Sequence, residues 1–258
     1  MRRTPPAGIE VPAALRPWVA SIHAMSLAPA VGVLTRPPDA ATTLVLRAAA
    51  DSRAHAVVLG PRTRASYHRA DKDIPLALRI RLRPGCARAV LGRSLDELLD
   101  RVVPLEELWG GAGARLAVTL NLAPHGSERT VRSLERALGA RIAALSTRDI
   151  TQARLARAAA EELGSGQARV RDVAERLHVS ERHLRASFRA AVGVSPKRFS
   201  RIQRVRGLLL HSEPRDLPRL SAEAGYCDQS HLTAEFRAAM GVTPGAFFAG
   251  ARPSPSGC

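Results

Sequence analysis

The chain has 258 residues, 45% of them hydrophobic, so it can form one large or two ordinary domains and is too apolar for wholesale disorder. No apolar run reaches the ~18 residues of a membrane span, and no apolar signal core follows the charged start, so the cytosol is the expected location. The net charge of +16 favours a polyanionic partner, but both halves are basic and bulk charge does not locate the binding surface.

The first 85 residues are rich in Pro and Gly and contain three short runs with the branched or alternating pattern of β-strands. The runs are TTLVLR (42–47), HAVVLG (55–60) and LALRIRLR (76–83). A Pro-Gly pair at 84–85 ends the last run. This part of the chain is therefore predicted to be β-rich.

Helical spacing follows in three segments. The first covers 94–110, where Ser94 can be the N-cap and Glu97 can complete a capping box. The second covers 128–145 and carries a stripe of apolar residues, for which core packing is the favoured role and dimerisation the alternative. The stripe consists of Val131, Leu134, Leu138, Ile142 and Leu145.

A third helix is predicted near 149–163 and ends at GSGQ, a linker or helix stop beyond which the sequence reads as all helix. We therefore expect an N-terminal domain at 1–147 and a helical domain at 148–251. The last residues, 252–258, are expected to be a disordered tail.

The helical part contains an internal repeat. LHVSERHLRASFRAAVGVSP (177–196) recurs 48 residues later within AGYCDQSHLTAEFRAAMGVTP (224–244), without a gap. About half of the aligned positions from 174 to 196 are identical to their counterparts. Chance does not produce such a match, so the same structural unit is expected twice.

Each copy has the pattern of a helix-turn-helix unit. In the first, a helix over 170–176 precedes a turn at His178, a residue type that tolerates a left-handed backbone, and Ser180 can cap the second helix. The expected buried residues are Val173, Leu177, Leu184 and Phe188. The expected exposed residues are Arg182, Arg185 and Arg189.

The second copy is predicted to have helices at 217–224 and from Asp228 onward, with Leu232 and Phe236 buried. A connecting helix should begin at the Ser195 cap and end near His211. Its roughly 15 residues would span ~22 Å. With the width of each unit added, the two recognition helices could enter major grooves one helical turn, ~34 Å, apart.

Residues 166–250 resemble the DNA-binding domain of the AraC/XylS family of bacterial transcription regulators. The second copy carries the resemblance most strongly, in AEAGYCDQSHLTAEFRAAMGVTPGAFF. The resemblance implies about seven helices, two helix-turn-helix units and binding to promoter DNA as an activator or repressor, with RNA polymerase as a further partner. The expected fold class is α+β, a β-rich domain followed by helices and then an all-α domain.

The resemblance also assigns roles to residues. The base-reading positions fall on Arg182, Arg185, Ala186, Gln229, Ser230, Thr233 and Ala234. Contacts to DNA phosphates, or plain surface charge, are expected for Arg189, Lys197, Arg198, Arg204 and Arg237. Arginine can bind a guanine edge through two hydrogen bonds, whereas alanine offers only a methyl contact, so the second unit should read sequence less strictly. His183 and His231 are expected to pack or cap.

The N-terminal part resembles, more weakly, an uncharacterised sensory-type domain found ahead of such DNA-binding modules. Three stretches carry the resemblance: LRPWVASI (15–22), VVLGPRTRA (57–65) and IRLRPGCARAVLGRSLDELLDRVVPLEELWG (80–110). It implies a small β-rich barrel or sandwich followed by helices, which binds a small-molecule effector or forms a homodimer. No metal, cofactor or membrane partner is expected, because no motif for one is present.

Two other functions stay open at the level of sequence. Some regulators with this module transfer alkyl groups to reactive cysteines, and Arg83 and Arg88 could lower the pKa of Cys86, although a small buried thiol is the simpler reading. The three cysteines, Cys86, Cys227 and Cys258, are too dispersed for a disulfide framework or a zinc site. Bulk charge alone would also suit a non-specific architectural DNA binder.

Overall fold

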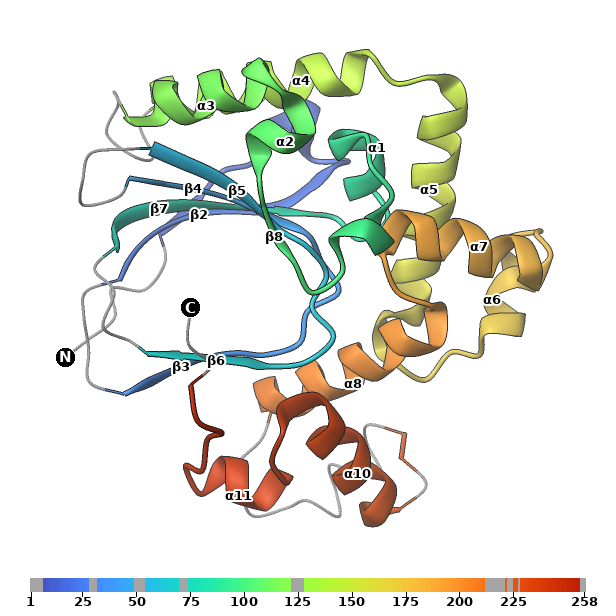
Figure 1. Cartoon of the computed structure of the whole chain (residues 1–258). Coiled ribbons are helices and arrows are strands. Elements are labelled where there is room, and N and C mark those ends of the chain that lie inside the picture. Colours follow the sequence, from blue (N-terminus) through green and yellow to red (C-terminus); the bar gives the residue numbers. More distant parts are fainter. Residues whose placement is uncertain are drawn as a thin grey trace.

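The structure is a computed structural model of the chain. It describes residues 7–27, 32–48, 54–69, 74–121, 128–211, 221, 225, 226 and 228–255. A β-rich N-terminal part is followed by helices and by a helical C-terminal part (Figure 1), which confirms the predicted fold class.

Two antiparallel sheets form the N-terminal part. The larger has the strand order β1-β2-β7-β4-β5-β8. Its strands are β1 (Ala7–Ile9), β2 (Val19–Leu27), β4 (Thr43–Ala48), β5 (Ala54–Leu59), β7 (Ile74–Leu82) and β8 (Val102–Pro104), with the 3₁₀ helix η1 (Ala13–Leu15) between β1 and β2. The smaller pairs β3 (Val33–Arg36) with β6 (Ser66–Arg69). Three of these strands, β4, β5 and β7, are the three that the sequence pattern predicts.

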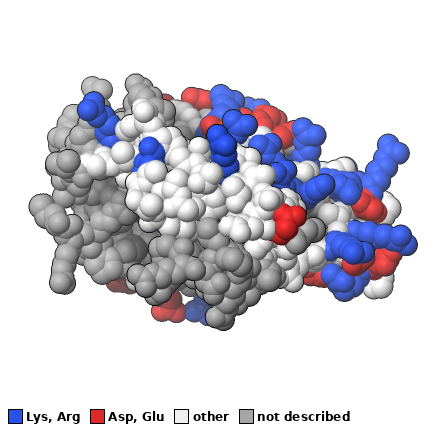
Figure 2. Space-filling model, turned by 90° about the horizontal axis from the view of Figure 1, so that it is seen from below, with Lys and Arg blue, Asp and Glu red and all other residues white. Residues whose placement is uncertain are grey.

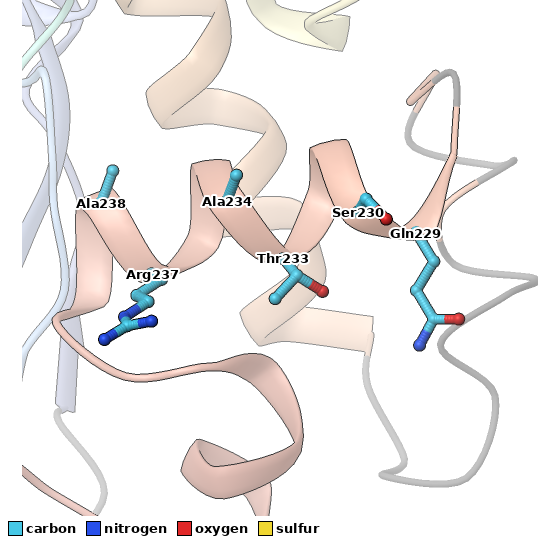
Figure 3. Close-up of a pocket in the computed structure, with 6 residues that line it drawn as sticks. All are labelled: Gln229, Ser230, Thr233, Ala234, Arg237 and Ala238. Carbon is cyan, nitrogen blue, oxygen red and sulfur yellow. The ribbon is translucent and has the colours of Figure 1, made fainter.

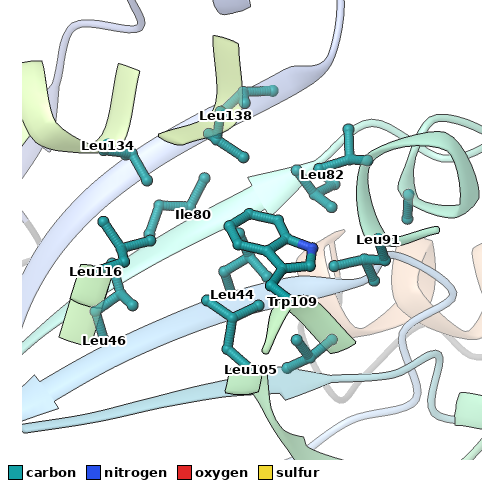
Figure 4. Packing of buried hydrophobic residues seen from close by; sticks show 14 of the residues in the cluster. Leu44, Leu46, Ile80, Leu82, Leu91, Leu105, Trp109, Leu116, Leu134 and Leu138 are labelled. Carbon is teal, nitrogen blue, oxygen red and sulfur yellow. The ribbon is translucent and has the colours of Figure 1, made fainter. Parts of the chain in front are cut away.

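One face of the larger sheet forms the main core. Alternate residues on its central strands, such as Leu44 and Ile80, are buried there against the helices that follow (Figure 4). Those elements are α1 (Ala87–Leu91), η2 (Leu95–Leu98), α2 (Leu105–Trp109), α3 (Gly111–Asn121) and α4 (Glu128–Ala143). In α4, Leu134 and Leu138 are fully buried in this core and Ile142 packs against it, so these three residues of the predicted apolar stripe pack within the chain.

The single helix predicted over 94–110 is wrong. The segment contains the short η2, the edge strand β8 and the separate helix α2. Ser94 does precede a helix, but its hydroxyl donates to Asp96 and accepts no capping bond. Asp100 has a left-handed backbone, φ 56°, and Pro104 provides no N–H for a continuous helix, so the chain turns twice here.

The C-terminal part consists of helices, several of them at the predicted positions. They are α5 (Thr147–Glu162), η3 (Leu163–Ser165), α6 (Val170–Arg176), α7 (Glu181–Val192), α8 (Pro196–His211), α10 (Gln229–Met240) and α11 (Pro244–Phe248). The predicted helix at 217–224 lies outside the described residues except for Ser221. Of the predicted tail, Arg252 places its guanidinium 3.8 Å from the Phe247 ring centre, and 256–258 lie outside the described residues.

None of the helices in the described part of the chain is long and apolar enough to cross a membrane.

Candidate nucleic-acid interface

The first repeat unit is built from α6, a turn and α7, as the sequence predicts. His178 has φ 53°, the left-handed conformation that the turn requires. Ser180 caps α7, because its hydroxyl accepts the backbone N–H of His183 at 3.2 Å. Leu184 and Phe188 are fully buried on the inner face of α7. The opposite face of α7 therefore points away from this core.

That outer face of α7 is basic. Arg182, Arg185, Ala186 and Arg189 are all exposed, as predicted. Arg185 donates from Nε to the Glu181 carboxylate at 2.8 Å, one helical turn away. Sequence reasoning missed Glu181, although its i,i+4 spacing to Arg185 is a recognisable ion-pair pattern. Such a surface pair is weak, so it can orient Arg185 without preventing a stronger contact.

The second recognition helix, α10, starts in the same way. The Asp228 carboxylate accepts the backbone N–H of His231 at 2.7 Å, while Leu232 and Phe236 are fully buried. The His231 ring packs edge-on against Tyr226 at 5.4 Å. His183 and His231 each donate their backbone N–H to the N-cap residue. The His231 ring packs, which is one of the two roles expected for these histidines.

A shallow hollow follows the outer face of α10 (Figure 3). Gln229, Thr233 and Arg237 lie in one row along the helix, and Ser230, Ala234 and Ala238 lie in a second. Four of the six are predicted base-reading residues, so the structure brings these four together on one surface. Ala238 was not predicted, but its four-residue spacing from Ala234 places it in the same row.

Helix α8 connects the two units and belongs to both of their cores. Phe199 and Ile202 pack in the core of the first unit, and Val205 and Leu208 pack in that of the second. The hydroxyl of Ser195 accepts the Arg198 backbone N–H at 3.3 Å, as expected of a cap. With 16 residues, α8 is about 24 Å long.

Arg204, predicted to contact phosphate, instead lies inside the domain. Its side chain is only 16% exposed, and it donates two hydrogen bonds from one nitrogen to the Glu235 carboxylate, at 3.0 and 2.9 Å. It also donates to the Gly166 carbonyl at 2.8 Å and lies over the Tyr226 ring. Arg204 therefore ties α8 to both units and is not available to DNA.

The carboxylate that holds Arg204 is itself 4% exposed and also accepts from Arg201 and from the Tyr226 hydroxyl, at 3.0 and 2.9 Å. Burial and the neighbouring Glu235 carboxylate raise the pKa of Tyr226 well above its ordinary value, which keeps the phenol a donor. Sequence reasoning missed Glu235 and Tyr226, because nothing local marks them as partners of Arg204.

The other predicted phosphate contacts lie on the surface. Arg189, Lys197, Arg198 and Arg237 are all exposed. Figure 2 shows Lys and Arg side chains gathered toward the right-hand edge of the molecule, which α6 and α7 form in Figure 1. On the face that Figure 2 shows, basic side chains with some acidic ones among them thus surround the first repeat unit.

A family model described as a helix-turn-helix domain matches residues 173–250, which span both repeat units. Residues 173–250 therefore form a helix-turn-helix domain. No curated protein matches the chain.

Several solved structures are similar to parts of this chain. The C-terminal domain of AraT, a response regulator from Geobacillus stearothermophilus, is 23% identical with a TM-score of 0.34, covering 40% of this chain and 87% of that one. The DNA-binding domain of AdpA, in complex with a target DNA, is 27% identical with a TM-score of 0.33, covering 38% and 89%. ToxT from Vibrio cholerae is 11% identical with a TM-score of 0.42, covering 88% and 95%.

Outside the helix-turn-helix domain, Cys86 is a buried thiol. Its Sγ donates to the Pro17 carbonyl at 3.6 Å. Burial raises the pKa of Cys86 to about 11, and nearby Arg157 and Arg83 do not offset that effect. Cys86 therefore does not have the lowered pKa that an alkyl-transfer role would need. No cluster of metal-binding side chains occurs in the described part of the chain.

Iodoacetamide is accordingly expected to label Cys86 slowly in the native protein at pH 7.5, because only the thiolate reacts and burial disfavours it. Labelling should become fast once guanidinium unfolds the chain. Peptide mass spectrometry measures the extent at Cys86 itself, separately from the other two cysteines. Rapid native labelling would instead favour a reactive cysteine.

Proposed function

We propose that the protein is a transcription regulator that binds promoter DNA sequence-specifically through α7 and α10, each in a major groove. The observation that carries this proposal is the pair of capped helices, each buried on one face and presenting the predicted base-reading residues on the other. The match to a helix-turn-helix domain at 173–250 supports it, as does the resemblance of this part to the AraC/XylS family. We further propose residues 1–147 and 148–251 as the two domains, the first with an effector or dimer role.

The two helices should contribute differently to recognition. Arg182 and Arg185 are exposed and long enough to reach guanine edges, where arginine binds through two hydrogen bonds. On α10, Gln229 is the long donor of the hollow besides Arg237, and its neighbours Ser230 and Ala234 are short. We therefore expect α7 to supply most of the discrimination between bases. We expect α10 mainly to position the protein along the DNA and to fit the shape of the groove.

Arg185→Ala is expected to weaken binding to the cognate site by about 10- to 100-fold and binding to random DNA only slightly, because a base contact carries sequence preference. Competition between labelled cognate DNA and random DNA measures both constants. The matched control is Arg198→Ala, a proposed phosphate contact, which should weaken both by a similar factor and reduce the salt dependence. If Arg185→Ala weakened binding to cognate and to random DNA by the same factor, Arg185 would contact a phosphate and not a base.

Selection of binding sites from a random DNA pool by the full chain tests the proposed function itself. We expect an asymmetric site with two motifs about 10 base pairs apart, as two recognition helices on one side of the duplex require. Strong, salt-sensitive binding that enriches no sequence would favour the non-specific architectural binder instead. RNA polymerase, a small-molecule effector and a second copy of the chain stay predictions.

A further inference from the structure

The N-terminal domain contacts both recognition helices at their C-terminal ends. Helix α7 ends at Gly193, with φ 83°, which lies against the other domain so closely that a Cβ there would be 2.7 Å from the Leu95 carbonyl oxygen and 2.9 Å from Pro61 Cγ. Gly193 corresponds to Gly241 in the 48-residue repeat, the residue that ends α10. The two helices are thus held at equivalent positions.

At the end of α10 the contact consists of hydrogen bonds. The backbone N–H of Ala65 donates to the Ala239 carbonyl at 2.7 Å, and the Tyr67 hydroxyl donates to the Met240 carbonyl at 2.5 Å. The last carbonyls of a helix have no partner within the helix, so these two donors act as an interdomain cap. Tyr67 is buried in this contact.

One short stretch of chain provides the contacts to both helix ends. Pro61 lies against the end of α7, and Ala65 binds the end of α10. Both belong to a stretch that we call the β5–β6 segment (residues 60–67), which comprises the link between β5 and β6 and the first two residues of β6. Four residues of extended chain span at most ~14 Å. The β5–β6 segment therefore limits how far apart the two helix ends can lie.

Hydrogen bonds on both sides hold the β5–β6 segment in place. The Asp100 carboxylate accepts from the backbone N–H and from the hydroxyl of Thr63, both at 2.7 Å. Arg62 exchanges backbone hydrogen bonds with Asp39 at 2.7 and 2.8 Å, and its guanidinium donates to the Pro37 carbonyl. A segment fixed in this way resists bending.

A third contact fixes α8, which joins the two units. Arg206 of α8 forms an ion pair with the Asp39 carboxylate, with an N–O distance of 3.2 Å, and Arg81 of β7 binds the same carboxylate. Burial by itself would raise the pKa of Asp39, but Arg81 and then Arg206 outweigh it and hold that pKa below its ordinary value. The carboxylate therefore stays charged at neutral pH and keeps the sheet attached to the connecting helix.

We propose that the β5–β6 segment sets the separation of the two recognition helices, and that the N-terminal domain thereby determines which spacing of half-sites the protein accepts. Ala65 and Tyr67 are the positioning residues for α10. The inference rests on the proposed function and adds a specificity element outside the DNA-binding domain. It also gives a physical role to the stretch VVLGPRTRA, which the helix-turn-helix units leave unexplained.

The test measures affinity for a series of operators. The selected site is resynthesised with its two half-sites moved apart or together by one and two base pairs, and the full chain is titrated on each. The variants are Tyr67→Phe, which removes the hydroxyl donor, and Ala65→Pro, which removes the N–H donor. Ala65→Gly keeps that N–H and is the matched control, and circular dichroism verifies that each variant is folded.

The unchanged protein should bind one spacing best. Tyr67→Phe should reduce the penalty for displaced half-sites about fivefold, the factor expected for one lost hydrogen bond, with base preferences within each half-site unchanged. Ala65→Pro should do the same and Ala65→Gly should not. If the unchanged protein is selective for spacing and both variants keep that selectivity, the inference is wrong; if it selects no sequence, the proposed function fails.

Discussion

Replacement of Glu235 by alanine is expected to destabilise the helix-turn-helix domain by about 3 kcal/mol, because removing one partner of a buried ion pair leaves the other charge uncompensated. Glu235 is 4% exposed and pairs with Arg204, which is 16% exposed. The Tyr226 hydroxyl would also lose its acceptor. Arg201, 47% exposed, can turn to solvent and adds little to this cost.

Two variants distinguish the effect of burial on stability from the effect of removing any carboxylate. Glu175→Ala removes an ion pair with Arg171 whose N–O distance, 3.0 Å, equals that between Arg201 and Glu235, but both of its partners are exposed. It should change stability little. Glu235→Gln keeps the shape but removes the charge and should fall between the two.

Urea unfolding followed by circular dichroism measures these differences. The helical signal comes mainly from the part of the chain that Glu235 stabilises. If Glu235→Ala unfolded at the same urea concentration as the parent, the ion pair between Arg204 and Glu235 would not contribute to stability. The expected free-energy cost of leaving Arg204 without its partner would then be wrong.

Much of the first helix-turn-helix unit could be predicted because its determinants are local. Ser180 lies three residues before the amide it caps, and His178 adopts the left-handed turn through its own backbone. The spacing of Leu184 and Phe188 fixes the buried face of α7 by helix periodicity alone. The repeat then transfers the same reasoning to α10, where Asp228 replaces Ser180.

The errors come from partners far away in sequence. The helix predicted over 94–110 is interrupted where Asp100 binds Thr63, 37 residues away. Arg204 resembles a surface cation until Glu235, 31 residues away, is placed beside it. Local patterns describe only the periodicity of a segment. They do not indicate which distant group will form a hydrogen bond or an ion pair with a given side chain.

The contact between the domains could not be predicted for a different reason. Ala65 binds Ala239 through backbone atoms, so the identities of these side chains give no signal. Tyr67 has an ordinary strand composition around it, and its hydroxyl partner is again a carbonyl. The stretch VVLGPRTRA likewise carries no local pattern that indicates what it contacts.

Gly60→Ala is expected to destabilise the N-terminal domain by about 3 kcal/mol, because overpacking against rigid backbone cannot relax by side-chain rotation. A Cβ on Gly60 would lie 1.8 Å from the Leu98 carbonyl oxygen and 2.8 Å from the carbonyl carbon. Relief would require the β5–β6 segment to move away from η2 and would break the bond from the Gly60 N–H to the Arg101 carbonyl, 3.0 Å long.

Gly139→Ala is the matched control for this prediction. Gly139 lies within α4, and a Cβ there has no neighbour within 4 Å, so alanine should stabilise the helix by about 0.5–1 kcal/mol. Fluorescence of the two tryptophans, Trp109 within this core and Trp18 packed against it, reports unfolding of this domain in urea. The β5–β6 segment begins at Gly60. At temperatures where the Gly60→Ala protein is still folded, it should therefore also discriminate less between half-site spacings than the parent does. A Gly60→Ala protein that matches its parent in both stability and spacing would show that this backbone is free to shift, and the proposed link between the N-terminal domain and the recognition helices would fail with it.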